Sequence, residues 1–144
     1  MNTPAHQLAT WLKQHQITEV ECIVSDLTGI ARGKISPTNK FLGEGGMRLP
    51  ESVLLQTVTG DFVDDDVYYA LLDEADIDMF CRPDADAMFL VPWAIEPTAM
   101  VIHDTFDKQG NPVELSPRNV LKRVLKLYAD KGWTPIVAPE MEFY

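Results

Sequence analysis

Cysteine is scarce in this chain. It has only Cys22 and Cys81, and neither belongs to a Cys-x-x-Cys pair. A disulfide framework or a zinc–thiolate site needs more cysteines at closer spacing, so the sequence argues against both. A reducing compartment is the simplest setting for such a chain.

Long apolar runs are missing as well. No stretch approaches the roughly 18 consecutive apolar residues that a membrane-spanning helix needs. The first residues, MNTPAHQLATWLKQHQ, have neither the basic start nor the apolar core of a signal peptide. We therefore expect a cytoplasmic protein without a membrane partner.

Basic residues are outnumbered. Twelve lysines and arginines stand against twenty-two aspartates and glutamates, which gives a formal net charge of -10. Nucleic acids and anionic membranes repel such a chain, so neither is expected as a partner. The charge fits a soluble enzyme or a surface that binds cations.

Two common binding motifs are absent. Gly33-Lys34 lacks the earlier glycine of a phosphate-binding loop and is better interpreted as a hairpin end. The acidic residues between 61 and 74 lack the spacing of a calcium-binding EF-hand, which favours a solvated loop over a cation site or a loop that attracts a polyamine. They are Asp61, Asp64, Asp65, Asp66 and Glu74.

The patterns that are present predict an α+β fold. Helices are expected over residues 4–15 and from Ser116 to about Gly132, and turns and loops over 43–66. Strands are expected over 19–26, 30–35, 77–80, 88–91, 99–102 and 134–144. Most of the strands precede residue 112, where we expect one domain to join the start of a second.

The last strand carries two acids in an apolar stretch, Glu140 and Glu142, within APEMEFY. On a strand, side chains two residues apart share a face and lie roughly 6.5–7 Å apart. Their charges then repel by about 2 kcal/mol at an effective dielectric constant near 20. In an enclosed site Mg²⁺ or Mn²⁺ can offset this repulsion. The alternative is the solvated side of an edge strand.

Several segments together resemble the glutamine synthetase family. They are SDLTGIARGK, EADIDMFCRPD, VIHDTFDKQGNPVELSPRNVL and the final PEMEFY. The most similar branch is that of γ-glutamylputrescine synthetases, which join glutamate to amines. The resemblance implies a β-grasp domain over residues 1–112 and the first helix and strand of a catalytic domain over 113–144. It also implies a ring-shaped homo-oligomer, a dodecamer, with active sites between neighbouring subunits.

The same resemblance assigns roles to the terminal acids. Glu140 is expected to hold the Mg²⁺ or Mn²⁺ ion beside the phosphates of the co-substrate ATP, and Glu142 the ion beside the glutamate site. Such ions offset the charge as the γ-carboxylate of glutamate meets the γ-phosphate of ATP. The family's other metal ligands and its catalytic residues are expected beyond Tyr144, so we expect this fragment alone to be inactive.

One segment departs from the pattern of ammonia-using members. These carry an Asp-Gly pair that binds ammonium, whereas the comparable stretch here is Met47–Val53 and lacks it. Glu51 is the candidate to take over this role in substrate binding. The departure favours a larger amine or polyamine as nucleophile. Two alternatives stay open: an ammonia-using glutamine synthetase, and a non-catalytic β-grasp interaction module or pseudoenzyme.

Overall fold

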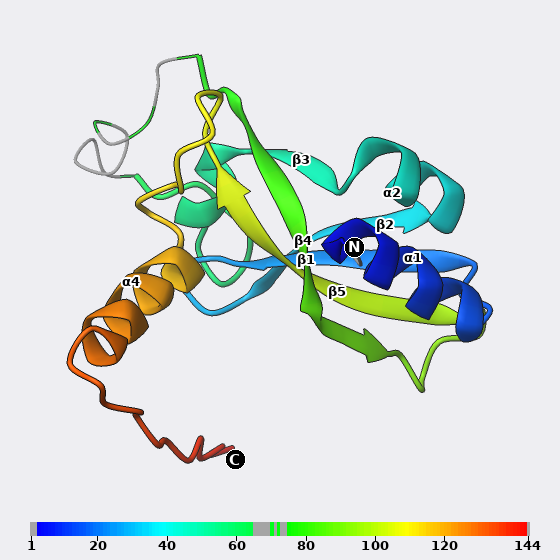
Figure 1. The fold of residues 1–144 in the computed structure, drawn as a ribbon. Coiled ribbons are helices and arrows are strands. Elements are labelled where there is room, and N and C mark those ends of the chain that lie inside the picture. Colours follow the sequence, from blue (N-terminus) through cyan, green and yellow to red (C-terminus); the bar gives the residue numbers. More distant parts are fainter. Residues whose placement is uncertain (1–2, 65–69, 71, 73–74, 144) are drawn as a thin grey trace.

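The computed structural model describes residues 3–64, 70, 72 and 75–143, and it has the mixed α+β architecture expected (Figure 1). Its elements are α1 (Pro4–Gln14), β1 (Glu19–Ser25), β2 (Ala31–Pro37), α2 (Thr38–Glu44), β3 (Met47–Pro50), the 3-10 helix η1 (Glu51–Leu55), β4 (Asp78–Leu90), β5 (Thr98–Phe106) and α4 (Pro117–Ala129). Within the described part of the chain, no helix combines the length and the apolar character needed to cross a bilayer.

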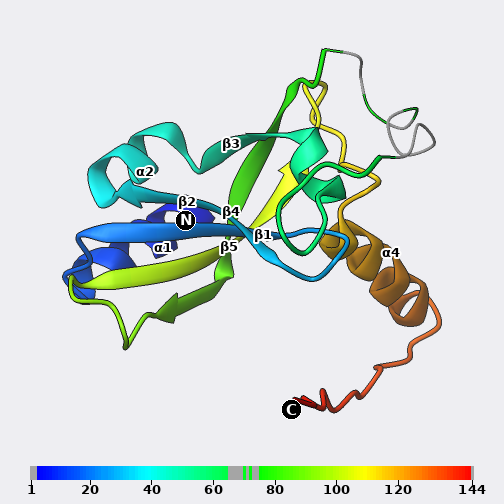
Figure 2. The same ribbon diagram turned by 180° about the vertical axis from the view of Figure 1, so that it is seen from behind.

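The five strands form one mixed sheet in the order β2-β1-β5-β4-β3. β1 and β5 run parallel at its centre, and the other neighbours are antiparallel. Figures 1 and 2 show α1 lying across one face of the sheet, and α4 beyond the far end of β5. The core lies under α1, where Leu8 and Leu12 pack with alternate residues of β1 and β5, because successive side chains of a strand point to opposite faces.

The first helix follows from its capping signals. The Thr3 hydroxyl accepts a hydrogen bond from the backbone N–H of His6 at 3.3 Å, and Pro4 occupies the first turn. The helix ends at Gln14, so the prediction for residues 4–15 is confirmed.

The turn between β1 and β2 is organised by a buried aspartate. Asp26 accepts hydrogen bonds from the backbone N–H groups of Thr28 and Ile30, at 2.9 and 2.8 Å, and from Nε of Arg32 at 2.7 Å. Arg32 also donates to the carbonyl oxygen of Thr57, which ties the hairpin to the segment after η1. Burial acts to raise the pKa of Asp26, but the hydrogen bonds from Arg32, Thr28 and Ile30 outweigh it and lower the pKa.

Two sequence predictions need correction here. The strands expected at 77–80 and 88–91 are parts of the single strand β4, whose pairing with β5 shifts register between Pro83 and Met88. The polar residues after Pro83 have the local pattern of a turn, yet the chain pairs with β5 both before and after them. The segment 43–66 holds the end of α2, β3 and η1 as well as turns.

His103 on β5 is enclosed in the core. It is 1% exposed, its Nδ1 lies 2.8 Å from the carbonyl oxygen of Val101, and its ring meets that of Phe41 edge-on. Burial lowers the pKa of His103 to about 4, against smaller opposing effects of hydrogen bonds and of the Asp104 charge. The folded protein therefore holds this imidazole neutral at neutral pH.

We expect His103 to make the sheet less stable in mild acid. Its pKa is about 4 in the folded state and 6.5 in the unfolded chain, so the unfolded state binds the extra proton between these values and stability falls as the pH drops. The full difference corresponds to about 3 kcal/mol. Hydrogen exchange of the β5 amides in the full-length protein, corrected for intrinsic rates, measures the free energy of unfolding at pH 7 and at pH 4.5. His103→Gln removes most of the dependence, whereas the same change at exposed His6 keeps it.

Candidate functional site

Helix α4 leads into the segment that carries Glu140 and Glu142, and its first turn is fixed to the sheet. Ser116 is the N-cap residue and Pro117 the first helical residue, as the sequence predicts. Asn119 is buried, and its side-chain amide donates to the carbonyl oxygens of Thr105 and Val113, at 2.9 and 3.0 Å. These bonds hold the start of α4 against the end of β5.

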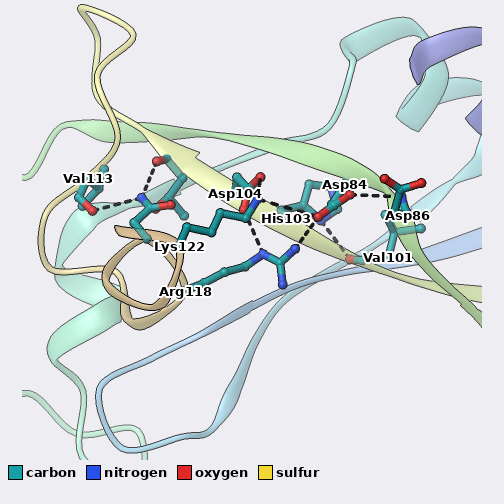
Figure 3. Close-up of polar contacts among 10 residues, drawn as sticks. Asp84, Asp86, Val101, His103, Asp104, Val113, Arg118 and Lys122 are labelled. Carbon is teal, nitrogen blue, oxygen red and sulfur yellow. Dashed lines mark hydrogen bonds and ion pairs between the residues drawn. The ribbon is translucent and has the colours of Figure 1, made fainter. Parts of the chain in front are cut away.

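A cluster of four charged residues, Asp84, Asp104, Arg118 and Lys122, strengthens this attachment (Figure 3). Arg118 forms ion pairs with both aspartates, and its Nε lies 2.8 Å from Oδ1 of Asp104. Lys122 pairs with Asp104 and lies 3.7 Å from Asp84. The cluster therefore joins β4 and β5 to α4 through residues that are far apart in sequence.

The surroundings of Asp84 in this cluster favour its ionised form. Burial acts to raise the pKa of Asp84, but the backbone N–H of Asp86 and the positive charges of Lys122 and Arg118 outweigh it and lower the pKa. The side chains of Arg118, Asp84 and Asp104 are only 18–25% exposed, so solvent screens these ion pairs less than those at an open surface. Asp84 is therefore held in its carboxylate form at neutral pH.

Beyond its first turn α4 has little cover. The predicted apolar face lies on one side of the helix, but its members are 40–55% exposed: Val120, Leu121, Val124, Leu125 and Tyr128. At the end of this face the ring of Trp133 lies 6.2 Å from that of Tyr128. An apolar surface of this kind indicates a place for further protein to pack.

The strand predicted over residues 134–144 is wrong for its described part. Gly132 has a φ of +71°, and residues 133–143 then carry neither helix nor strand. A strand needs a neighbour for its N–H and C=O groups, and no described strand runs beside this segment. The argument that strand geometry places Glu140 and Glu142 on one face therefore does not apply here.

Glu140 and Glu142 are both exposed, as are their apolar neighbours Met141 and Phe143. Nowhere among the described residues do three or more histidine, cysteine, aspartate or glutamate side chains gather as they would around a metal ion. Carboxylate oxygens are nevertheless the donors that Mg²⁺ and Mn²⁺ prefer, so the residue types fit the expected ions. Their assignment as metal ligands stays a prediction.

Glu51 lies in a different part of the fold. It begins η1, directly after β3, and is half-buried. It lines a cavity of about 290 Å³ together with Asp78, Asp107 and Lys108. The structure does not bring η1 and the segment after α4 together, and Figures 1 and 2 place them well apart.

The acidic segment after η1 is described only in part. Asp61 accepts a hydrogen bond from the Thr59 hydroxyl at 2.7 Å, and its backbone N–H donates to Thr57, as in a local turn. Asp64 is exposed. Asp65, Asp66 and Glu74 lie outside the described residues.

The four-residue charge cluster was not predicted. Asp84 follows Pro83 and reads as part of a turn, and the lysine and arginine side chains of α4 read as its solvated face. The available signal was the pair Arg118 and Lys122, which are four residues apart and so share one side of the helix. Locating their partners requires the fold.

Comparison with known proteins places residues 114–144 in the family described as glutamine synthetase, catalytic domain. The chain is 30% identical over 142 residues to gamma-glutamylputrescine synthetase of Escherichia coli, covering 96% of this chain and 29% of that protein. It is 29% identical over 136 residues to glutamate–isopropylamine ligase of a Pseudomonas species, covering 93% of this chain and 29% of the ligase. The chain thus spans less than a third of the length of these relatives.

Among solved structures the chain is similar to one described as a GmaS/ADP complex, with a TM-score of 0.66 and 24% identity. The match covers 86% of this chain and 26% of that one. At this identity the match shows a shared fold.

Proposed function

We propose that this chain, which resembles the glutamine synthetase family along nearly its whole length, is part of an ATP-dependent ligase that joins glutamate to an amine. The observation that carries the proposal is the similarity to two relatives named as ligases of glutamate with amines, over 93% and 96% of the chain. The product is a γ-glutamyl amide, such as γ-glutamylputrescine, formed through a γ-glutamyl phosphate.

The proposed domain division is a β-grasp domain over residues 1–112 and the start of the catalytic domain over 113–144. The mixed sheet, with its hairpin of β1 and β2 and parallel central pair β1 and β5, supports the first part. The family match beginning at residue 114 supports the second. In the full-length protein the exposed apolar face of α4 packs against the remainder of the catalytic domain. The assembly is a cytoplasmic ring-shaped homo-oligomer.

Glu140 and Glu142 are the proposed ligands of Mg²⁺ or Mn²⁺. Bound metal would offset the negative charge on the phosphates of ATP and the γ-carboxylate of glutamate. The two glutamates contribute by binding the ions at fixed points of the chain, Glu140 on the ATP side and Glu142 on the glutamate side. Further ligands would come from the rest of the protein.

The nucleophile is proposed to be an amine larger than ammonia. The stretch Met47–Val53 lacks an Asp-Gly pair, and the names of both relatives contain an organic amine. Glu51 can attract the ammonium group of such an amine before it loses its proton. It lies at the start of η1 on a cavity lined by three carboxylates and one lysine, Lys108, and this excess of negative charge supports a role in binding a cation.

Phosphate release by the full-length protein tests the function. We expect glutamate- and ATP-dependent release that saturates with putrescine, isopropylamine or another alkylamine, and that is far slower with ammonium. Saturable turnover with ammonium alone would instead identify an ammonia-using glutamine synthetase. No turnover with ammonium or any amine, at saturating ATP and Mg²⁺, would favour a non-catalytic module.

A further inference from the structure

A group of cations surrounds one groove of this otherwise acidic chain. The groove has a volume of about 550 Å³ and lies between β2, the end of α2, β3 and β4. Four of the twelve lysines and arginines line it, and Glu44 is the carboxylate among its lining residues. The four cations are Lys34, Lys40, Arg48 and Arg82.

Three of these cations differ from Arg32 and Arg118 in how their charge is neutralised. Arg32 and Arg118 are paired with buried or half-buried aspartates. Among the described residues, no carboxylate lies within ion-pair distance of Lys34, Arg48 or Arg82, and Lys40 has only an exposed pair with Glu44 at 3.9 Å. Within the described part of the chain, three of the four groove cations therefore have no ion-pair partner, and Glu44 beside Lys40 is the one carboxylate of the groove.

Two contacts orient both guanidinium groups and leave their N–H donors available. Arg48 lies over the ring of Phe80, a lining residue of the groove, at 4.2 Å, and Arg82 lies over the ring of Phe106, which is outside the lining, at 4.4 Å. Stacking of this kind uses the flat face of the guanidinium, so the N–H groups along its edge can still donate to an oxygen anion. A stacked arginine also loses less side-chain freedom when it binds.

Contacts to the backbone fix the residues that line the groove. Nζ of Lys34 donates to the carbonyl oxygen of Arg48 at 2.8 Å, which links β2 to β3 although they lie at opposite ends of the strand order. Gly46 has a φ of +133°, and a Cβ there would lie 2.2 Å from the carbonyl oxygen of Cys81, so only glycine fits. The position of the lining residues is thus fixed without a ligand.

We propose that this groove binds a small polyvalent oxyanion of the phosphate or carboxylate class. Charge-assisted hydrogen bonds from two arginines and a lysine suit such a group, and arginine forks match both phosphate and carboxylate geometry. The groove lining includes neither Glu140 nor Glu142, so the two proposed sites are formed by different residues.

Arginine modification by phenylglyoxal, with peptides of the full-length protein quantified by mass spectrometry, tests the proposal residue by residue. Inorganic phosphate or succinate should slow modification of Arg48 and Arg82 by about threefold or more, the factor expected at twice the dissociation constant. Exposed Arg123 serves as the internal control and should react at an unchanged rate. Protection by phosphate alone or by succinate alone identifies which oxyanion the groove takes.

Matched variants make the test specific. Arg82→Gln should abolish the protection of Arg48, whereas Arg123→Gln, which removes the same charge elsewhere, should leave it intact. The proposal is overturned if neither anion protects, or if sodium chloride of equal ionic strength protects equally well. Because the readout needs no turnover, it stands or fails apart from the proposed ligase activity.

Discussion

Replacing Glu140 or Glu142 by alanine in the full-length protein is expected to lower ATP-dependent phosphate release by about 100-fold or more. Each change removes a carboxylate that we propose holds a divalent ion, so negative charge at the reacting groups is no longer offset. The two variants should differ in detail. Glu140→Ala should mainly raise the KM for metal-bound ATP, and Glu142→Ala the KM for glutamate. Steady-state kinetics at varied Mg²⁺ measures both.

Exposed Glu114 provides the control, because it lies in the same matched segment and Glu114→Ala removes the same charge. That variant should keep its activity. Glu140→Asp should recover part of the rate at raised Mg²⁺, since it restores a carboxylate on a shorter side chain. Full turnover by the Glu140→Ala, Glu142→Ala double variant would remove the metal-ligand assignment.

Asp26→Ala is expected to cost about 3–5 kcal/mol of the unfolding free energy of the sheet, the range for breaking a buried ion pair. The Asp26 side chain is fully enclosed, and its loss leaves Arg32 and the backbone N–H groups of Thr28 and Ile30 without their acceptor. Hydrogen exchange of the β1 amides in the full-length protein measures the effect.

Two further variants serve as controls for the effect of Asp26→Ala. Asp26→Asn keeps an acceptor oxygen for the turn and should lose less. Asp130→Ala breaks an exposed pair with Lys126 and should change stability by less than about 1 kcal/mol. An equal effect of Asp26→Ala and Asp130→Ala would contradict the role given to the buried network.

Local signals explain which parts of the fold could be predicted. α1 and α4 begin at capping residues followed by proline, and β1 alternates strictly between buried and partly exposed residues, so each was evident from sequence. α2 was not, because it is one short helix with a single buried residue, Phe41, and contains Gly43. The sequence predicts two strands in place of β4 because the local strand pattern stops at Pro83. In the structure, pairing with β5 continues beyond this point.

The same distinction holds for the candidate sites. Glu140, Glu142 and Glu51 could be singled out because family motifs lie in short continuous segments. The charge cluster and the cationic groove could not, because residues from distant parts of the chain meet there only in the folded sheet. The final strand was predicted from its residue pattern and from the family resemblance, and neither supplies the hydrogen-bonding neighbour that a strand requires.

Because α4 is attached to the sheet near one end, a small tilt of the helix moves its other end by a larger distance. The helix has 13 residues and so is about 20 Å long, while among the described residues the polar contacts that attach it to the sheet, those of Arg118, Asn119 and Lys122, all lie in its first half. A tilt of about 5° at this pivot moves the far end by about 2 Å. Without further contacts, small shifts between β4 and β5 are therefore amplified at the segment that carries Glu140 and Glu142, and packing of the α4 apolar face against the rest of the catalytic domain, as proposed, would suppress this movement.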